Sequence, residues 1–216
     1  EIVQTVSATG RIQPKTQVKI SADVSAKITK LGVKEGDWVE KGDFLLELDR
    51  ESYVATVERE EANLRSSQSG VTLADENVTK TEKDYKRTRE LFERGLESQS
   101  VLDAAYAAYE VEKARRQSAR DQVEQVRAAL KQTQDNLSKT TIYAPISGTV
   151  SRLDKEQGEI ALGSQFQEDV IMIISNLSGM EALVDVDEND IVLVAIGDEA
   201  TIEVDALTNQ TFKGIV

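Results

Sequence analysis

The 216-residue sequence contains no histidine and no cysteine. Histidine is the commonest general base and metal ligand, and the Ser-His and Cys-His pairs require it, so its absence excludes most catalytic and metal sites. A chain without cysteine forms no disulfide, which by itself says little about its compartment. The 39 acidic residues make neighbouring carboxylates common by chance, and no glycine-rich phosphate-binding loop is present. We therefore expect a protein that is not an enzyme and holds no metal ion.

An excess of positive charge and long hydrophobic runs are also missing. The net charge of −13 argues against a nucleic-acid groove or an anionic membrane surface as the partner. Apolar runs such as Val170–Ile174 are far shorter than the roughly 20 residues that span a bilayer. No signal peptide is visible, and the chain begins at Glu1. We expect a fragment or processed form of a longer protein, with any membrane anchor outside these residues.

Residues 51–139 lack proline, and Gly70 is the only glycine between Glu51 and Arg94. Apolar residues recur there at seven-residue spacing, at Val57, Leu64, Val71, Val78, Tyr85 and Phe92. After a break at Gly95–Gln99 the spacing returns at Leu102, Tyr109, Arg116, Val123, Leu130 and Leu137. Such heptads predict two long helices that pack along one seam.

The two heptad series are mirror images about position 97. Folding the chain there pairs Phe92 with Leu102, Val78 with Arg116 and Val57 with Leu137. A second, mostly small series pairs in the same register, with Ala74 opposite Ala119. This pattern predicts an antiparallel coiled-coil hairpin over residues 51–140, with arms of about 60 Å that must project from any compact domain.

The segments on either side of the hairpin are copies of one another. At an offset of 122 positions, Ile20–Ile28 aligns with Ile142–Val150 and Gly36 aligns with Gly158. The match slips only later, where Gln165–Asp169 lengthens the second copy. An interrupted duplication predicts two half-domains, residues 15–50 and 141–175, that pair into one β-sandwich.

The remaining residues, 1–14 and 176–216, predict a β-barrel-like domain that is incomplete. Residues 1–14 read as an extended segment around Ile2 and Val3, and Ala182–Val186 and Thr201–Val204 alternate as half-buried strands do. A helical turn is expected within Asp187–Ile196, before Gly197. The fold class is thus mixed α and β and multidomain, with the hairpin inserted into a split sandwich.

Two sets of residues resemble a known family. The half-motif from Ala26 to Asp49 and its second half from Ala144 to Ile160 resemble the split biotinyl/lipoyl domain of periplasmic adaptor proteins, also called membrane fusion proteins (HlyD-like), most closely those of ABC-type macrolide exporters. Inserting a coiled-coil hairpin between the halves is that family's architecture. Arg87, Leu91 and Ser98 resemble the hairpin-tip signature through which such adaptors engage a TolC-like outer-membrane channel.

The resemblance implies a function without chemistry. The protein would be an adaptor of a tripartite efflux or secretion pump, joining an inner-membrane ABC or RND transporter to a TolC-like channel. It would form a trimer or hexamer in the periplasm, held at the inner membrane of a Gram-negative bacterium by an anchor outside this chain. The lipoyl-like domain would be structural and without a cofactor, because carrier domains modify a lysine between their halves and Glu47–Glu51 contains none.

Other readings stay open. The alternatives are a biotin or lipoate carrier domain of a multienzyme complex, and a coiled-coil scaffold that binds neither pump nor channel. At the tip, Leu91 would then only close the hairpin and Ser98 would only cap the second helix. For Arg116 we expect a structural role, paired with a neighbour such as Glu112.

Overall fold

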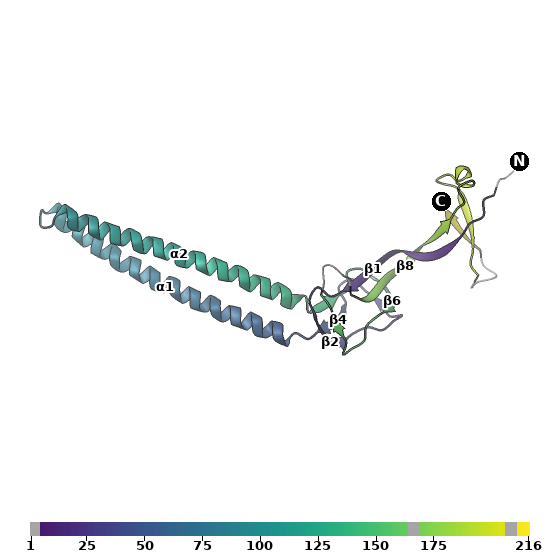
Figure 1. The fold of residues 1–216 in the computed structure, drawn as a ribbon, viewed down its shortest axis with the longest axis horizontal. Coiled ribbons are helices and arrows are strands. Elements are labelled where there is room, and N and C mark those ends of the chain that lie inside the picture. The colour runs from purple at the N-terminus through teal and green to yellow at the C-terminus, as the bar shows by residue number, and fades with distance from the viewer. Residues whose placement is uncertain (1–4, 164–168, 206–210) are drawn as a thin grey trace.

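The chain is elongated, with a helical hairpin at one end and β-structure in the middle and at the other end (Figure 1). This computed structural model describes residues 5–163, 169–205 and 211–216. The expected strand residues Ile2 and Val3, and most of the expected insertion at 165–169, lie outside the described residues.

The hairpin consists of α1 (Glu51–Glu93) and α2 (Gln99–Ser138), as predicted. Every residue of the predicted main seam is buried or half-buried, although the surrounding helix surface is exposed. Near the tip, the rings of Tyr85 and Tyr109 stack with centroids 6.0 Å apart, which confirms the expected register. Burial of one narrow stripe on each helix holds the pair together, because neither helix is strongly apolar around its circumference.

Arg116 occupies the predicted seam position opposite Val78, but the predicted ion pair between Arg116 and Glu112 is wrong. Its guanidinium lies 3.8 Å from the carboxylate of Asp75, across the hairpin, whereas Glu112 pairs with Arg115 at 2.7 Å. The Arg116 side chain is 31% exposed, so its stem covers the seam while its charged end reaches the surface. The ion pair therefore joins α1 to α2 rather than two turns of α2.

Gly70 lies in the middle of α1, where a β-carbon would meet no atom within 4 Å. Glycine in a helix interior costs about 1 kcal/mol relative to alanine, because it loses more backbone entropy on folding. We predict that Gly70→Ala raises the free energy of unfolding by about 1 kcal/mol. Urea unfolding followed by circular dichroism at 222 nm would measure this, and a loss of stability would show a close contact at Gly70.

The middle of the molecule is a sandwich of two four-stranded sheets. One sheet has the order β1-β8-β6-β3 and the other β5-β4-β2-β7. The strand bounds are β1 (Thr9–Ser21), β2 (Ala26–Leu31), β3 (Trp38–Val39), β4 (Phe44–Leu48), β5 (Thr141–Tyr143), β6 (Gly148–Leu153), β7 (Ile160–Ala161) and β8 (Val170–Asp185).

The two halves of the sandwich contain equivalent strands and turns, as the duplication in the sequence predicted. Strands β2 and β6 span aligned residues, as do β3 and β7. The Gly36 N–H donates to the Val150 carbonyl at 2.8 Å, and the aligned Gly158 N–H donates to the Ile28 carbonyl at 2.9 Å. Both glycines have positive φ, near +93° and +100°, a conformation that strains other residues. Each sheet therefore contains strands from both halves, so neither half closes its core alone.

The hairpin is rooted in this sandwich through short connections. β4 leads into α1 and α2 leads into β5, and β4 and β5 are neighbours in one sheet. The Tyr53 hydroxyl of α1 donates to the Ser25 carbonyl at 3.1 Å. Because both arms start from adjacent strands, the hairpin leaves the sandwich as one rod.

Asp169 and Lys155 form a partly buried ion pair of 2.7 Å beside β8. The Lys155 ammonium, and then the Leu162 N–H, hold the pKa of Asp169 below its ordinary value. A lowered pKa in the folded protein stabilises it above the unfolded value, about pH 4, and this contribution is lost as the pH falls through the folded value.

Lowering the pH from 6 to 3 should reduce the free energy of unfolding of the parent. We predict a smaller reduction for Asp169→Asn, because this variant lacks the titrating carboxylate. Urea unfolding at the two pH values measures the difference, since the other carboxylates contribute equally to both proteins. Equal losses in the two proteins would contradict the assignment.

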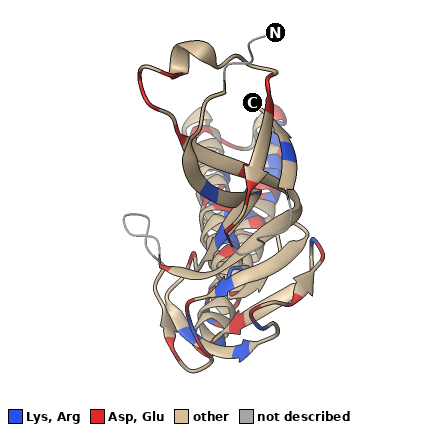
Figure 2. Cartoon of the chain, turned by 90° about the vertical axis from the view of Figure 1, so that its right-hand side faces the viewer, with Lys and Arg blue, Asp and Glu red and all other residues tan. Residues whose placement is uncertain are grey.

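The far end combines the outer parts of β1 and β8 with β9 (Glu199–Glu203), β10 (Thr211–Ile215) and the 3₁₀ turn η1 (Ile191–Leu193). This is the expected partial barrel. Residues 181–205 contain acidic residues but no lysine or arginine, and the acidic residues appear as red segments in Figure 2. The expected domain limits at 14/15 and 175/176 stay a prediction. β1 and β8 run through both limits as continuous strands, with an irregularity between Pro14 and Thr16.

Candidate functional site: the hairpin tip

A tight turn of residues 94–98 joins the helices at the end of the hairpin farthest from the sandwich (Figure 1). Gly95 has φ near +74°, and its N–H donates to the Phe92 carbonyl at 2.8 Å. The Leu96 N–H donates to the Leu91 carbonyl at 2.9 Å. This is a glycine-terminated helix end, which satisfies the last carbonyls of α1.

Ser98 begins α2 as its N-cap, as the sequence suggested. Its extended backbone and its Oγ, which accepts from the Val101 N–H at 3.4 Å, fit that position. The serine is nevertheless exposed, so its cap role and a contact with a partner are compatible.

The structure places the three predicted tip residues at the same end of the rod, but their side chains differ in exposure. Arg87 is exposed and ion-paired with Asp84, one turn earlier on α1. Leu91 is half-buried rather than freely exposed. The three residues, Arg87, Leu91 and Ser98, are called the tip patch below, and their role in binding stays a prediction.

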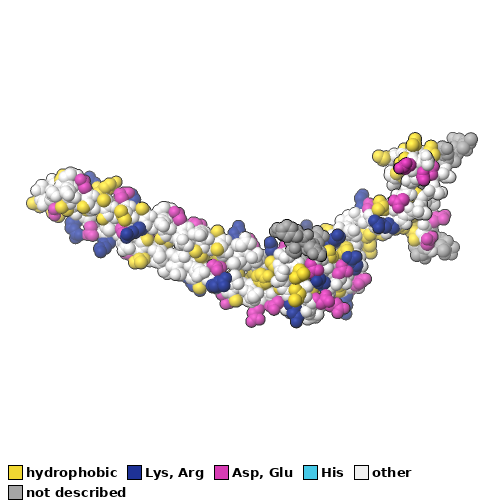
Figure 3. All heavy atoms as spheres, viewed as in Figure 1, with side chains coloured by type: hydrophobic (Ala, Val, Ile, Leu, Met, Phe, Trp, Pro, Cys, Tyr) yellow, Lys and Arg dark blue, Asp and Glu magenta, His cyan; other side chains and the backbone are white. Residues whose placement is uncertain are grey.

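Sequence reasoning missed the most exposed apolar residue of the tip. Leu96 lies in the turn with 68% of its surface accessible, and Val101 on the first turn of α2 is also exposed. Figure 3 shows apolar side chains, in yellow, reaching the surface at this end of the hairpin. A leucine placed directly after the turn glycine was the available signal, since turns favour polar residues.

Several charged side chains near the tip are paired along α1. Lys86 lies 2.6 Å from Glu82, and Arg89 lies 2.9 Å from Glu93. The hydrogen bond from Lys86 lowers the pKa of Glu82, and the same contact raises the pKa of Lys86. Such exposed pairs contribute little to stability. They can therefore be exchanged for pairs with another molecule at small cost, which suits a binding surface.

The side chains of the tip form no cluster of metal-binding type. Across the described residues no group of three acidic, histidine or cysteine side chains is placed to hold a metal ion. Among the helices in these ranges, none has a stretch apolar enough to cross a membrane. What the tip does offer is a small exposed surface at the end of a stiff rod.

The sequence and this architecture resemble those of known proteins. Residues 16–174 match the profile of the family described as "RND MFP, barrel-sandwich hybrid domain", where MFP is membrane fusion protein. The chain is 32% identical over 190 residues to the pyoverdine export membrane fusion protein PvdR of Pseudomonas aeruginosa, covering 88% of this chain and 48% of PvdR. It is 28% identical over 200 residues to the macrolide export protein MacA of Escherichia coli O157:H7, covering 93% of this chain and 54% of MacA.

A solved structure shows the same fold along nearly the whole chain. The crystal structure of MacA from Actinobacillus actinomycetemcomitans superposes with a TM-score of 0.90 at 28% identity, covering 98% of this chain and 64% of that one. The chain spans about half the length of the curated relatives it matches. The split sandwich, its inserted hairpin and the family profile agree, and the chain belongs to the membrane fusion protein family.

Proposed function

We propose that this chain is part of a periplasmic adaptor in a tripartite efflux or secretion pump. The adaptor bridges an inner-membrane transporter of the ABC or RND type and a TolC-like outer-membrane channel. The single observation that carries the proposal is a stiff, 43-residue α1 paired with a 40-residue α2, rooted in a sandwich whose profile is that of membrane fusion proteins. At 1.5 Å per residue the rod spans about 60 Å, which suits a spacer between two membranes.

The mechanism is positional rather than catalytic. The sandwich fixes the base of the rod, and the paired seam keeps the tip in a defined place relative to that base. Several copies stand side by side around the substrate path, the tip patch contacts the channel, and the acidic β end lies toward the transporter. The transporter supplies the energy, so the adaptor itself is not an enzyme.

The names of relatives support export as the process. PvdR is described as a pyoverdine export protein and MacA as a macrolide export protein. We propose transport of a drug or other small molecule for this chain as well, with the periplasm of a Gram-negative bacterium as its location and an inner-membrane anchor in the whole protein.

A pull-down tests this proposal. The tagged protein is expressed with its native leader and anchor, crosslinked in cells and purified from detergent-solubilised membranes. Mass spectrometry should identify one ABC or RND transporter and one TolC-like channel, and deletion of the hairpin should deplete the channel while the transporter is still recovered. Recovery of neither would favour the scaffold, and a biotinyl or lipoyl adduct on any lysine would favour the carrier domain.

A further inference from the structure

Within the part of the chain that the structure describes, the two most exposed large apolar side chains lie in one turn at the β end. Ile196 is 97% exposed and Val192, in the middle of η1, is 84% exposed. Ile191 and Leu193 of η1 are exposed as well. Single apolar residues are common on protein surfaces, but a cluster marks a contact surface. The turn therefore presents an unpartnered apolar face.

Local hydrogen bonds hold this turn in place from both ends. The Asp187 carbonyl accepts hydrogen bonds from the N–H groups of Asp190 and Ile191, at 3.0 and 3.1 Å. The Asp198 carboxylate accepts one from the Ala195 N–H at 2.8 Å. The turn is thus built by its own backbone and its own aspartates, and the apolar side chains between them are left for contact with another molecule.

The same turn carries carboxylates that no cation neutralises. Residues 187–199 contain five acidic residues and no lysine or arginine. Glu188 and Glu199 are exposed and Asp190 is half-buried. Across the described ranges, none of these three carboxylates forms an ion pair. Figure 3 shows acidic side chains, in magenta, beside apolar side chains, in yellow, at this end of the molecule.

The charge of the whole chain is concentrated at this end. Residues 181–205 contain nine acidic and no basic residues, so they carry −9 of the net charge of −13 and the other 191 residues together carry −4. The cations on the neighbouring strands lie outside the turn, since Arg11 of β1 is opposite Leu183 and Lys213 of β10 is opposite Thr201. A molecule approaching η1 therefore meets a negative potential, which attracts a cationic partner.

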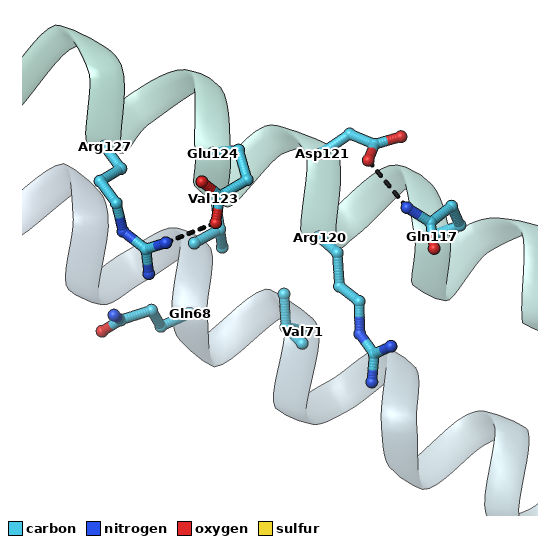
Figure 4. A pocket seen from close by; sticks show the side chains of 8 residues that line it. All are labelled: Gln68, Val71, Gln117, Arg120, Asp121, Val123, Glu124 and Arg127. Atoms are coloured by element: carbon cyan, nitrogen blue, oxygen red, sulfur yellow. Dashed lines mark hydrogen bonds and ion pairs between the residues drawn. The ribbon is translucent and has the colours of Figure 1, made fainter.

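The hollow halfway along the hairpin shows the opposite arrangement (Figure 4). It measures about 410 Å³, and six of its eight lining residues are polar or charged. Arg127 pairs with Glu124, and Gln117 donates a hydrogen bond to Asp121 at 2.8 Å. Its polar groups are thus satisfied within the hairpin, whereas the turn has carboxylates and apolar side chains without partners among the described residues.

We propose that the turn of residues 187–199 docks a segment of the inner-membrane transporter in which lysine or arginine flanks a bulky apolar side chain. The proposal rests on the proposed function, which places this end toward the transporter, and it names the chemistry of the transporter segment. The apolar side chain covers Val192 and Ile196, and the cations pair with Glu188 and Glu199.

Charge selects this occupant over the others. Burial of the exposed apolar side chains gains free energy, but a partner that covers the turn also removes water from the carboxylates around it. An uncharged partner would leave those carboxylates without compensation. The same turn of a second copy would bring like charges together, which costs several kcal/mol. A basic segment satisfies both parts of the surface.

Photo-crosslinking in cells identifies the occupant. The full-length adaptor, with its native leader and anchor, carries p-benzoylphenylalanine in place of Ile196, and crosslinked peptides are identified by mass spectrometry. The expected product joins this position to a transporter segment that contains lysine or arginine. Its yield should be about tenfold or more that obtained with the crosslinker in place of Leu177, an exposed residue of β8 with uncharged neighbours in sequence.

Three outcomes of this crosslinking would overturn the proposal. The first is a product with another part of the same chain or with a second copy. The second is a product with a transporter segment that contains no basic residue. The third is an equal yield of transporter product from the two positions.

Binding of the full-length adaptor to the transporter recovered in the pull-down, held in nanodiscs, measures the charge contribution. Glu188→Lys, Glu199→Lys should weaken binding about tenfold at 0.15 M salt and less at 1 M, because the Debye length falls from about 8 Å to about 3 Å. Glu58→Lys, Glu76→Lys changes the net charge equally at exposed positions of α1 and should bind like the parent. Equal losses in the two double variants would overturn the proposal.

Ile196→Ser measures the apolar contribution. It should weaken binding by about ten- to a hundredfold at both salt concentrations, the effect of leaving one isoleucine unburied, whereas Leu177→Ser should not change it. A parent adaptor that binds no transporter would contradict the proposed function. A parent that binds, together with Ile196→Ser that binds equally tightly, would overturn this docking site alone.

Discussion

The double variant Arg87→Asp, Leu91→Asp is expected to lose binding to the outer-membrane channel while the protein stays folded. The change removes a cation and an apolar contact from the tip patch and adds two carboxylates. Truncation of a hot-spot residue at the centre of an interface costs about 2 kcal/mol or more, and we expect the tip patch to contain such residues. Together the two changes should weaken binding by at least several hundredfold, about 3.5 kcal/mol.

The measurement is binding of the purified TolC-like channel in detergent to immobilised adaptor. Arg87 is exposed and Leu91 only half-buried, so circular dichroism at 222 nm should show an unchanged helix content. Leu73→Asp is the matched control, an exposed leucine of the same helix far from the tip. The affinity of this control variant for the channel should match that of the parent. A double variant that binds as tightly as the parent would remove the tip patch from the interface and favour the scaffold.

Leu96→Asp refines this test. The turn leucine is more exposed than Leu91, so it has more surface to bury against a partner. Loss of binding in Leu96→Asp comparable to that in Leu91→Asp would extend the tip patch to the turn.

Ile28→Ala is expected to destabilise the sandwich by about 2–5 kcal/mol, the usual cost of removing a buried branched side chain. Ile28 is fully buried and packs within the single core formed by both halves. Its carbonyl also accepts the hydrogen bond from Gly158 of the second half. The cavity would therefore open where the two copies of the duplication meet.

Fluorescence of Trp38, the only tryptophan, follows this unfolding transition in urea. Trp38 lies on β3, paired with Thr149 of β6, so its signal reports whether the two halves stay together. The control is Lys27, the exposed neighbour of Ile28. Lys27→Ala should change the free energy of unfolding by less than about 0.5 kcal/mol. An equally small effect for Ile28→Ala would mean that the core tolerates the cavity or that Ile28 is not part of it.

The sequence alone determined the hairpin and the duplication, because both follow from regular spacing. A heptad repeat depends only on which face of a helix is apolar, and two such repeats mirrored about position 97 permit one register. The aligned glycines at 36 and 158 predicted equivalent turns, and both have positive φ. Ser98 as a helix cap followed from local chemistry in the same way.

Only the tertiary structure decided features that depend on distance between elements. Arg116 pairs with Asp75 across the hairpin because a long side chain selects its partner by reach rather than by separation in sequence. Leu91 became half-buried and Leu96 exposed because the geometry of one glycine turn sets which leucine faces solvent.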